Sequence, residues 1–134
     1  MSGTQADPRL IERTRLVAQG EGYVVVDKPA GVLSVPGKHE HNKRCVLDWV
    51  RARFPHASGP LVVHRLDMDT SGLLVIALTA AVQRVLSGQF ERQEVRKAYV
   101  ALVEGRVPAE SGEVRVPMRP DYANRPYQVV YFLG

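Results

Sequence analysis

The sequence predicts a mixed α+β fold with a largely antiparallel sheet and a few flanking helices. Three observations support this prediction. Runs rich in valine, leucine and isoleucine recur along the chain and outnumber the segments with helical spacing. The two kinds of segment do not alternate strictly, as they would in a doubly wound parallel sheet. Glycine, proline and aspartate separate the runs and supply the turns.

The first half of the chain predicts two strands and a helix. Residues 22–37 (GYVVVDKPAGVLSVPG) read as a strand, a tight turn at Pro-Ala-Gly, and a short second strand. Residues 45–54 (CVLDWVRARF) have apolar positions at helical spacing, and Pro55 marks the exit. The single cysteine, Cys45, lies in this helix and is expected to be structural.

The second half predicts further strands around one helix. Residues 61–63 form a strand that leads into a charged cluster, and residues 73–78 form a buried strand. Thr79 can cap a helix whose apolar stripe ends at Phe90. Residues 97–105 and 112–118 read as two more strands, and an irregular segment, RPDYANRPY, follows them.

Composition indicates one globular domain. Of the 134 residues, 45% are hydrophobic and 24% are charged. Residues 1–14 are expected to form a flexible tail, and the domain is expected to continue from residue 15 to residue 134. No apolar run is long enough to span a membrane, and the N-terminus lacks the features of a secretory signal. We therefore expect no membrane association and a cytoplasmic location.

The charge balance favours a polyanionic partner. The chain has 18 lysines and arginines against 14 acidic residues, for a net charge of +4 and an isoelectric point near 9.5. Arginine supplies 14 of the 18 positive charges. Its planar, multiply donating group suits phosphates and base edges, which favours nucleic acid.

The segment VVHRLDMDTSGLLVIALT places charge between two aliphatic runs. A buried carboxylate costs several kcal/mol unless it is paired, so this cluster indicates a site on a loop. Asp67 is the stronger candidate for a nucleophile or general base, because Arg65 lies two positions away on the same predicted face. Asp69 is less favoured. The alternative is that Asp67 only caps its own turn.

The histidines and the absence of known cofactor motifs indicate neither a metal site nor a nucleotide cofactor. His64 either contacts a ligand or packs its ring against the sheet. His39 and His41 have no cysteine or carboxylate framework around them, so no metal site is predicted. The sequence contains no glycine-rich phosphate loop, so no nucleotide cofactor is expected.

Four segments resemble the RluA-type pseudouridine synthases in the same order along the chain. HRLDMDTSGLLVIA matches the family pattern of HRLD, two free positions and TSG followed by an aliphatic strand. VVVDKPAGVLSVPG resembles the early strand and its Lys-Pro-x-Gly turn, RKAYVALVEG the Lys-x-Tyr-x-Ala strand, and PMRPDYANRP the loop after it. The resemblance covers nearly the whole chain.

The resemblance implies a cofactor-free isomerase that converts uridine to pseudouridine in structured ribosomal or transfer RNA. Asp67 would be the catalytic carboxylate, which attacks the sugar or the base or removes a sugar proton. Arg65 would lie against the opened RNA, and Tyr99 would stack on a flipped uracil and help with proton transfer. Tyr99 as an ordinary packed tyrosine is the alternative. Arg119 and Arg125 flank Tyr122, which suits RNA binding and equally suits a plain surface loop.

The resemblance also has a gap. The family's catalytic domain continues past this chain's last residues and contains a GRxHQxR segment, whereas Gly105-Arg106 here is followed by Val107. We therefore expect an incomplete pseudouridine synthase fold, the N-terminal part of the catalytic domain, with an exposed sheet edge that favours self-association. The alternatives are a noncatalytic RNA-binding remnant and an inactive product of a truncated gene.

Overall fold

The computed structural model describes residues 9–37, 44–125 and 127–131. The chain divides into two compact units, residues 1–97 and residues 98–134, and each is described by itself. The sequence predicted one continuous domain from residue 15. The division arises because residues 95–117 contain no helix or strand, and the residues of this stretch beyond 97 are exposed, so they contribute little packing.

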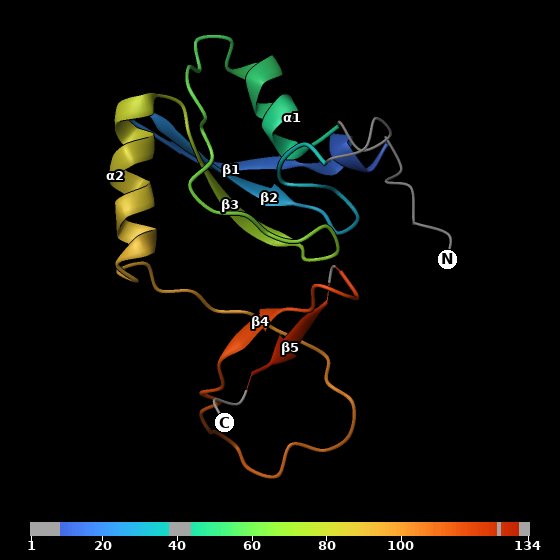
Figure 1. The fold of residues 1–134 in the computed structure, drawn as a ribbon. Helices are drawn as coiled ribbons and strands as arrows, with labels where there is room; N and C mark the ends of the chain where they lie inside the picture. The colour runs from blue at the N-terminus through green and yellow to red at the C-terminus, as the bar shows by residue number, and fades with distance from the viewer. Residues whose placement is uncertain (1–8, 38–43, 126, 132–134) are drawn as a thin grey trace. The chain divides into compact units, whose positions relative to one another are not determined.

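The first unit is a three-stranded antiparallel sheet with two helices, and the predicted α+β class is confirmed (Figure 1). The strands lie in the order β1-β2-β3, with β2 in the middle. The elements of this unit are η1 (Leu10–Arg13), β1 (Arg15–Gly20), β2 (Tyr23–Lys28), α1 (Val46–Arg53), β3 (Gly72–Ala77) and α2 (Ala80–Glu91).

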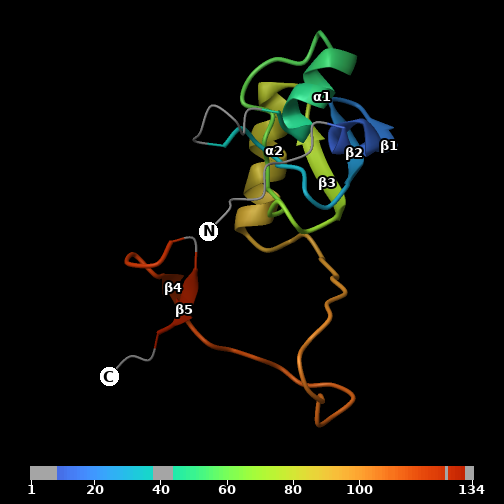
Figure 2. The ribbon, with the colours of Figure 1, turned by 90° about the vertical axis from the view of Figure 1, so that its right-hand side faces the viewer.

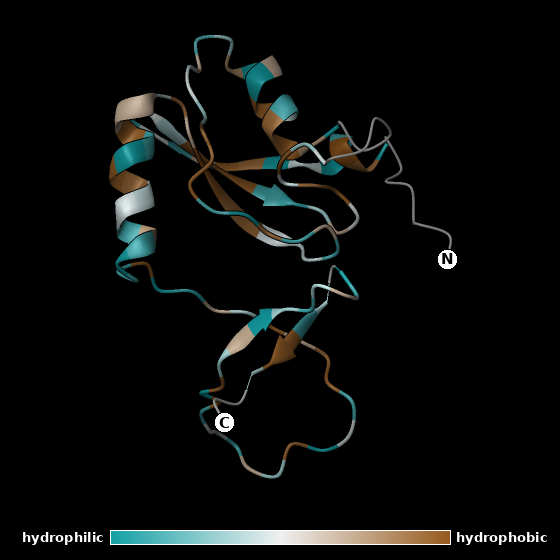
Figure 3. Ribbon diagram, viewed as in Figure 1, coloured by the Kyte–Doolittle hydropathy of each residue, from teal (hydrophilic) through white to brown (hydrophobic). Residues whose placement is uncertain are grey.

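The buried face of the sheet is built by β2 and β3, as the sequence predicts. Side chains alternate across a strand, so Val24 and Val26 of β2 point to one face, where both are fully buried. Val24 pairs with Ile76 and Val26 with Leu74, which continues the same face on β3. Figure 3 shows hydrophobic residues running along the middle of this sheet. Their removal from water is the main force that holds the unit together.

The helix α1 covers the buried face and confirms the predicted helix. Figures 1 and 2 both show α1 lying across one side of the sheet. At its start, the backbone N–H and the thiol of Cys45 each lie 3.3 Å from the Asp48 carboxylate. At its end, the Phe54 N–H donates to the Val50 carbonyl at 2.8 Å. Its core residues are Val46, Leu47, Trp49 and Val50.

The N-terminal segment corrects the predicted tail for residues 10–14. These residues form η1 and the turn into β1, and Ile11 packs in the core with 8% of its surface exposed. The sequence also missed β1. Leu16 and Val17 are 46% and 54% exposed, so the strand has no buried alternation to reveal it. It exists because it pairs with β2, from Arg15 opposite Asp27 onward.

Two segments predicted as strands, residues 32–36 and 61–63, form only one isolated β-bridge each. Leu33 bridges Cys45, and Val62 bridges Ile76. Residues 32–36 do not extend into a sheet, because the carbonyls of residues 33 and 34 accept hydrogen bonds from the first N–H groups of α1. Residues 61–63 are interrupted at Leu61, whose φ of 60° lies outside the extended region.

The helix α2 begins as predicted. The Thr79 hydroxyl accepts a hydrogen bond from the Val82 N–H at 3.3 Å, which satisfies one free donor of the first turn. No residue of α2 is fully buried, and Val85 is 61% exposed. The helix therefore packs on the β3 side of the sheet with only part of its apolar stripe.

The second unit is a two-stranded antiparallel hairpin, β4 (Met118–Pro120) and β5 (Gln128–Val130). The predicted strand over residues 97–105 is wrong: this segment is irregular, and Val100 and Leu102 are fully exposed. Extended residues need a partner strand, and no described strand pairs with this segment. The predicted strand over 112–118 is likewise irregular until Met118.

Candidate active site

The charged cluster occupies the loop that enters β3. The Thr70 N–H donates to the Asp67 carbonyl at 3.1 Å, so the backbone itself closes the turn. The Asp67 carboxylate is 84% exposed and pairs with Arg65, whose Nη2 lies 3.9 Å from Oδ1. The sequence left open the alternative that the Asp67 side chain caps its own turn. Among the described residues, this side chain accepts no hydrogen bond from the backbone. The carboxylate is therefore accessible to a ligand.

Arg65 shares this exposed surface. Its side chain is 70% exposed, and the contact with Asp67 is long enough to leave most of its donors unused. An exposed ion pair of this kind adds little to stability. The pair places a positive group beside the carboxylate, as the predicted same-face arrangement of positions 65 and 67 requires.

Lys28, which is fully buried, holds the loop from its interior side. Its Nζ donates to three carbonyl oxygens, those of Pro29 at 3.1 Å, Val32 at 2.5 Å and Met68 at 2.9 Å. Three acceptors match the three donors of an ammonium group. The Gly31 N–H also donates to Met68 O, at 2.8 Å. The Lys-Pro-Ala-Gly turn is thus fastened to the residue after Asp67.

Burial lowers the pKa of Lys28, and the negative charges of Asp69 and then Asp67 oppose that shift. The two carboxylates thereby offset part of the free energy lost when the ammonium leaves water. A side chain as fully buried as that of Lys28 faces neither solvent nor a phosphate group. Its position on a β-strand gave no sign of this role, because the three acceptors come from two separate loops.

Ser34 holds the other side of the loop. Its Oγ donates to the Leu66 carbonyl at 2.6 Å and accepts from the Leu66 N–H at 3.1 Å. Ser34 is 5% exposed and Leu66 is 6% exposed, so both bonds lie away from water. Lys28 and Ser34 therefore fix the residues on each side of Asp67. Sequence reasoning missed Ser34, whose small polar side chain stands in an apolar run.

His64 packs against the unit, which was the alternative to ligand contact. Its Nε2 accepts a hydrogen bond from the Val75 N–H at 3.0 Å, and its ring stacks on Phe90 with centroids 4.3 Å apart. Burial, followed by the nearby charge of Lys97, lowers the pKa of His64. A neutral imidazole is the form that can accept from Val75. The ring thereby covers a backbone donor at the outer edge of β3.

Three other predicted site residues lie in the second unit. Tyr99 is 64% exposed. The Arg119 guanidinium lies 4.5 Å from the Tyr131 ring centroid, and that of Arg125 lies 5.1 Å from the Tyr122 centroid. Each arginine is thus paired with an aromatic ring, an arrangement that can stack on nucleic acid bases. Of the predicted site residues, the structure joins Arg65 to Asp67 in the first unit, while Arg119 and Arg125 each contact a tyrosine ring in the second.

Neither a metal centre nor a membrane segment is found in the part of the chain that the structure describes. No group of three or more histidine, cysteine, aspartate or glutamate side chains there could hold a metal ion. His39 and His41 lie outside the described residues. Among the described helices, none has the length and apolar character needed to cross a membrane.

Comparison with known proteins identifies the family of this chain. The chain matches the RNA pseudouridylate synthase family over residues 22–132. This match covers the charged loop and most of each unit, and the chain belongs to that family.

Its relatives are of the RluA type. The chain is 44% identical over 114 residues to the dual-specificity RNA pseudouridine synthase RluA of Yersinia pestis, which covers 85% of this chain and 54% of the relative. The enzyme of the same name from Escherichia coli K12 is 43% identical over 117 residues, 87% of this chain and 52% of the relative. That of Pasteurella multocida is 38% identical over the same shares. The chain spans about half the length of the curated relatives it matches.

Proposed function

We propose that this chain carries the catalytic carboxylate of an RNA pseudouridine synthase, and that Asp67 is that carboxylate. The observation that carries the proposal is the combination of an 84% exposed carboxylate and a loop anchored on both sides by buried side chains. Groups that must react need access to substrate, and their backbone must be fixed beforehand. Membership of the family gives this arrangement its chemistry.

The proposed reaction is an isomerisation without cofactor. The bond between C1′ of the ribose and N1 of uracil breaks, the base turns, and a bond forms between C1′ and C5. The proton on C5 is then lost, and N1 gains one, so no atom is added overall. Asp67 attacks the sugar, attacks the base or removes a sugar proton, and these three steps are distinguished by trapping experiments.

The remaining residues are proposed to handle the RNA. A uridine inside a stem has to leave the stack before its glycosidic bond can be reached. Arg65, which is exposed beside Asp67, is proposed to contact the opened RNA. Tyr99 is proposed to stack on the flipped uracil, and Arg119 and Arg125 to contact RNA beside their tyrosine partners. For His64 the packing against Phe90 supports a role in holding Arg65 in place.

The substrates are proposed to be ribosomal and transfer RNA, which places the reaction in the cytoplasm. The relatives are named dual-specificity RNA pseudouridine synthases, and the basic charge of this chain suits an RNA partner. We further propose that residues 15–134 are the N-terminal part of the catalytic domain. The open edge at β1, with its exposed Leu16 and Val17, supports association with further strands or with a second copy.

The test is pseudouridine formation by the purified 134-residue chain on unmodified ribosomal and transfer RNA, read by carbodiimide labelling and primer extension. We expect any product that the wild-type chain forms to disappear in Asp67→Ala and to be kept in Asp69→Ala. Because Asp67 is exposed, its substitution should change the free energy of unfolding by no more than about 0.5 kcal/mol. RNA binding without product from a folded wild-type chain would instead support the noncatalytic RNA binder.

A further inference from the structure

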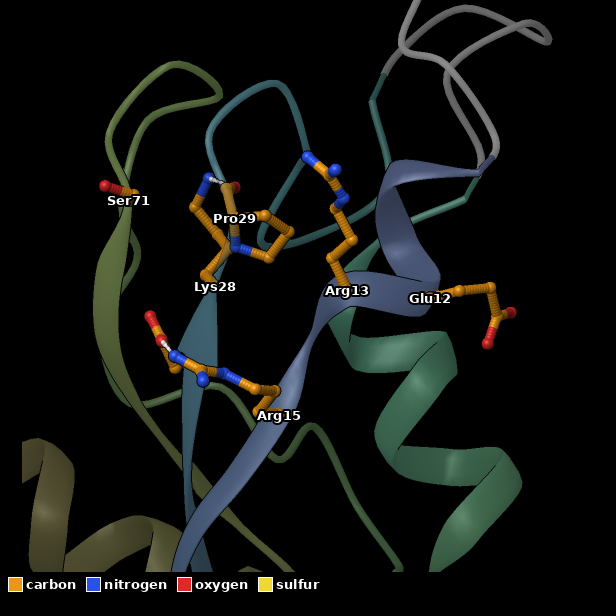
Figure 4. Close-up of a pocket in the computed structure, with 7 residues that line it drawn as sticks. Glu12, Arg13, Arg15, Lys28, Pro29 and Ser71 are labelled. Carbon is orange, nitrogen blue, oxygen red and sulfur yellow. Dashed lines mark hydrogen bonds and ion pairs between the residues drawn. The ribbon is translucent and has the colours of Figure 1, made fainter.

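A second basic feature lies beside the charged loop, at the end of the sheet where β1 begins and β2 ends. An open hollow of roughly 550 Å³ lies there, and Figure 4 shows the residues that line it. Its walls come from three segments: the turn from η1 into β1, the last residues of β2 with Pro29, and Ser71 just before β3. Ser71 belongs to the same loop as Asp67, so the hollow adjoins the candidate active site within the first unit.

The hollow presents arginines with unused donors. Arg13 has an exposed side chain and makes no ion pair with any described residue. Arg15 uses one amino group, Nη2, on Asp27 at 2.6 Å, and 77% of its side chain is exposed. The contact fixes the direction of the guanidinium and leaves its other N–H groups for a ligand.

The acidic residues around the hollow do not cancel this charge. Asp27 is engaged by Arg15. Glu12 is exposed at the rim, and Figure 4 shows its side chain directed away from the other side chains of the hollow. Lys28 is fully buried and its three donors are taken by carbonyl groups, so it adds no donor to the hollow. Two exposed guanidinium groups therefore stand beside one engaged carboxylate.

We infer that this hollow is a phosphodiester-binding subsite, formed by Arg13 and Arg15, that holds the RNA backbone next to the nucleotide at Asp67. The inference rests on the proposed function and extends it. An exposed guanidinium group with unused donors can bind the oxygens of a phosphate, and such contacts position a nucleic acid without reading its sequence. Neither arginine was among the site residues predicted from the sequence, because Arg13 fell in the expected tail and β1 was not recognised.

The test is the salt dependence of RNA affinity for the full chain and three variants, Arg13→Gln, Arg15→Gln and Arg84→Gln. Arg84 is an exposed arginine of α2 that does not line the hollow, so it is the matched control. Each lost phosphate contact should reduce the slope of log affinity against log salt by about 0.7 to 0.9 and weaken binding several-fold. We expect this change in the first two variants and not in the third.

Arg13→Lys separates a charge effect from a fold effect. Lysine keeps the positive charge, so this variant should recover the salt slope of the wild-type chain, although it lacks the planar fork with which arginine binds two oxygens side by side. Slopes in both hollow variants equal to that of the wild type, with normal RNA binding and product, would overturn the subsite and leave the proposed function standing.

A wild-type chain that binds no RNA and forms no product would count against the proposed function instead. Titration with inorganic phosphate at constant ionic strength then tests whether the hollow binds an anion. The NMR signals of the Arg13 and Arg15 side-chain N–H groups monitor this titration. Saturable shifts that vanish in Arg13→Gln and persist in Arg84→Gln support an anion site. Equal responses to phosphate and chloride overturn it.

Discussion

The hydroxyl of Ser34 binds both backbone polar groups of Leu66, donating to the carbonyl at 2.6 Å and accepting from the N–H at 3.1 Å. A single small side chain therefore replaces the two hydrogen bonds that a neighbouring strand would supply. The residue it holds comes immediately before Asp67, so the position of the candidate catalytic group depends on Ser34.

Ser34→Ala should lower the free energy of unfolding by roughly 1–3 kcal/mol, because it leaves a buried N–H and a buried carbonyl without partners. Urea denaturation followed by circular dichroism measures the change. Ser58→Ala, at an exposed position, is the control and should change the free energy by less than about 0.5 kcal/mol. A Ser34→Ala chain as stable as the wild type would show that water replaces the hydroxyl.

Lys28→Met should lower the free energy of unfolding by about 2–4 kcal/mol, because three carbonyl oxygens lose their donor in a buried site. The opposing effect is that methionine does not have to leave water as a charge. Arg84→Met, at an exposed basic residue of α2, is the control. A more stable Lys28→Met chain would mean that the desolvation of the ammonium outweighs its hydrogen bonds.

His64 should titrate below its ordinary pKa of about 6.5, because burial and the Lys97 charge both disfavour the imidazolium. The unfolded chain then binds more protons than the folded chain, so the free energy of unfolding is highest above about pH 6.5 and falls as the pH drops toward the folded pKa. The imidazole proton signals in NMR measure the pKa directly.

Lys97→Gln provides the matched variant for this titration, since it removes the nearby positive charge and should raise the pKa of His64. A His64 that titrates at its ordinary pKa of about 6.5 or above would contradict the packing against Phe90 and the bond from Val75.

Cys45 should react slowly with alkylating reagents at pH 8, because burial raises the pKa of its thiol to about 11 and the side chain is inaccessible. Iodoacetamide labelling followed by mass spectrometry measures the rate. The same chain in concentrated urea is the control and should react much faster. Rapid labelling under native conditions would show that the start of α1 opens frequently.

The sequence predicted the features that depend on local signals. The helix after Cys45 and the helix after Thr79 follow from apolar spacing and capping, and β2 and β3 follow from runs of buried aliphatic residues. The strand β1 could not be predicted from its own residues, because Leu16 and Val17 are exposed and only pairing with β2 defines it. The predicted strand over 97–105 has strand composition but no described partner.

In the candidate site, too, the features with local sequence signals were predicted and those that depend on distant contacts were missed. The loop with Arg65 and Asp67 was found because charge between aliphatic runs is a local signal. The roles of Lys28 and Ser34 were missed, since their partners Met68 and Leu66 lie 40 and 32 positions away. From sequence alone, a lysine at the end of a strand is expected to face solvent, because the loop that buries it is distant along the chain.

These separations also bear on the order of events in folding. The contacts that hold Asp67 join segments 32 to 40 residues apart, so they can form only after a long loop has closed. Contacts of this kind form later than a helix such as α1 and slow the overall rate. We expect the loop around Asp67 to acquire its shape in the last step, together with the pairing of β2 and β3, so a partly folded chain has a sheet hairpin and helices before it has a site.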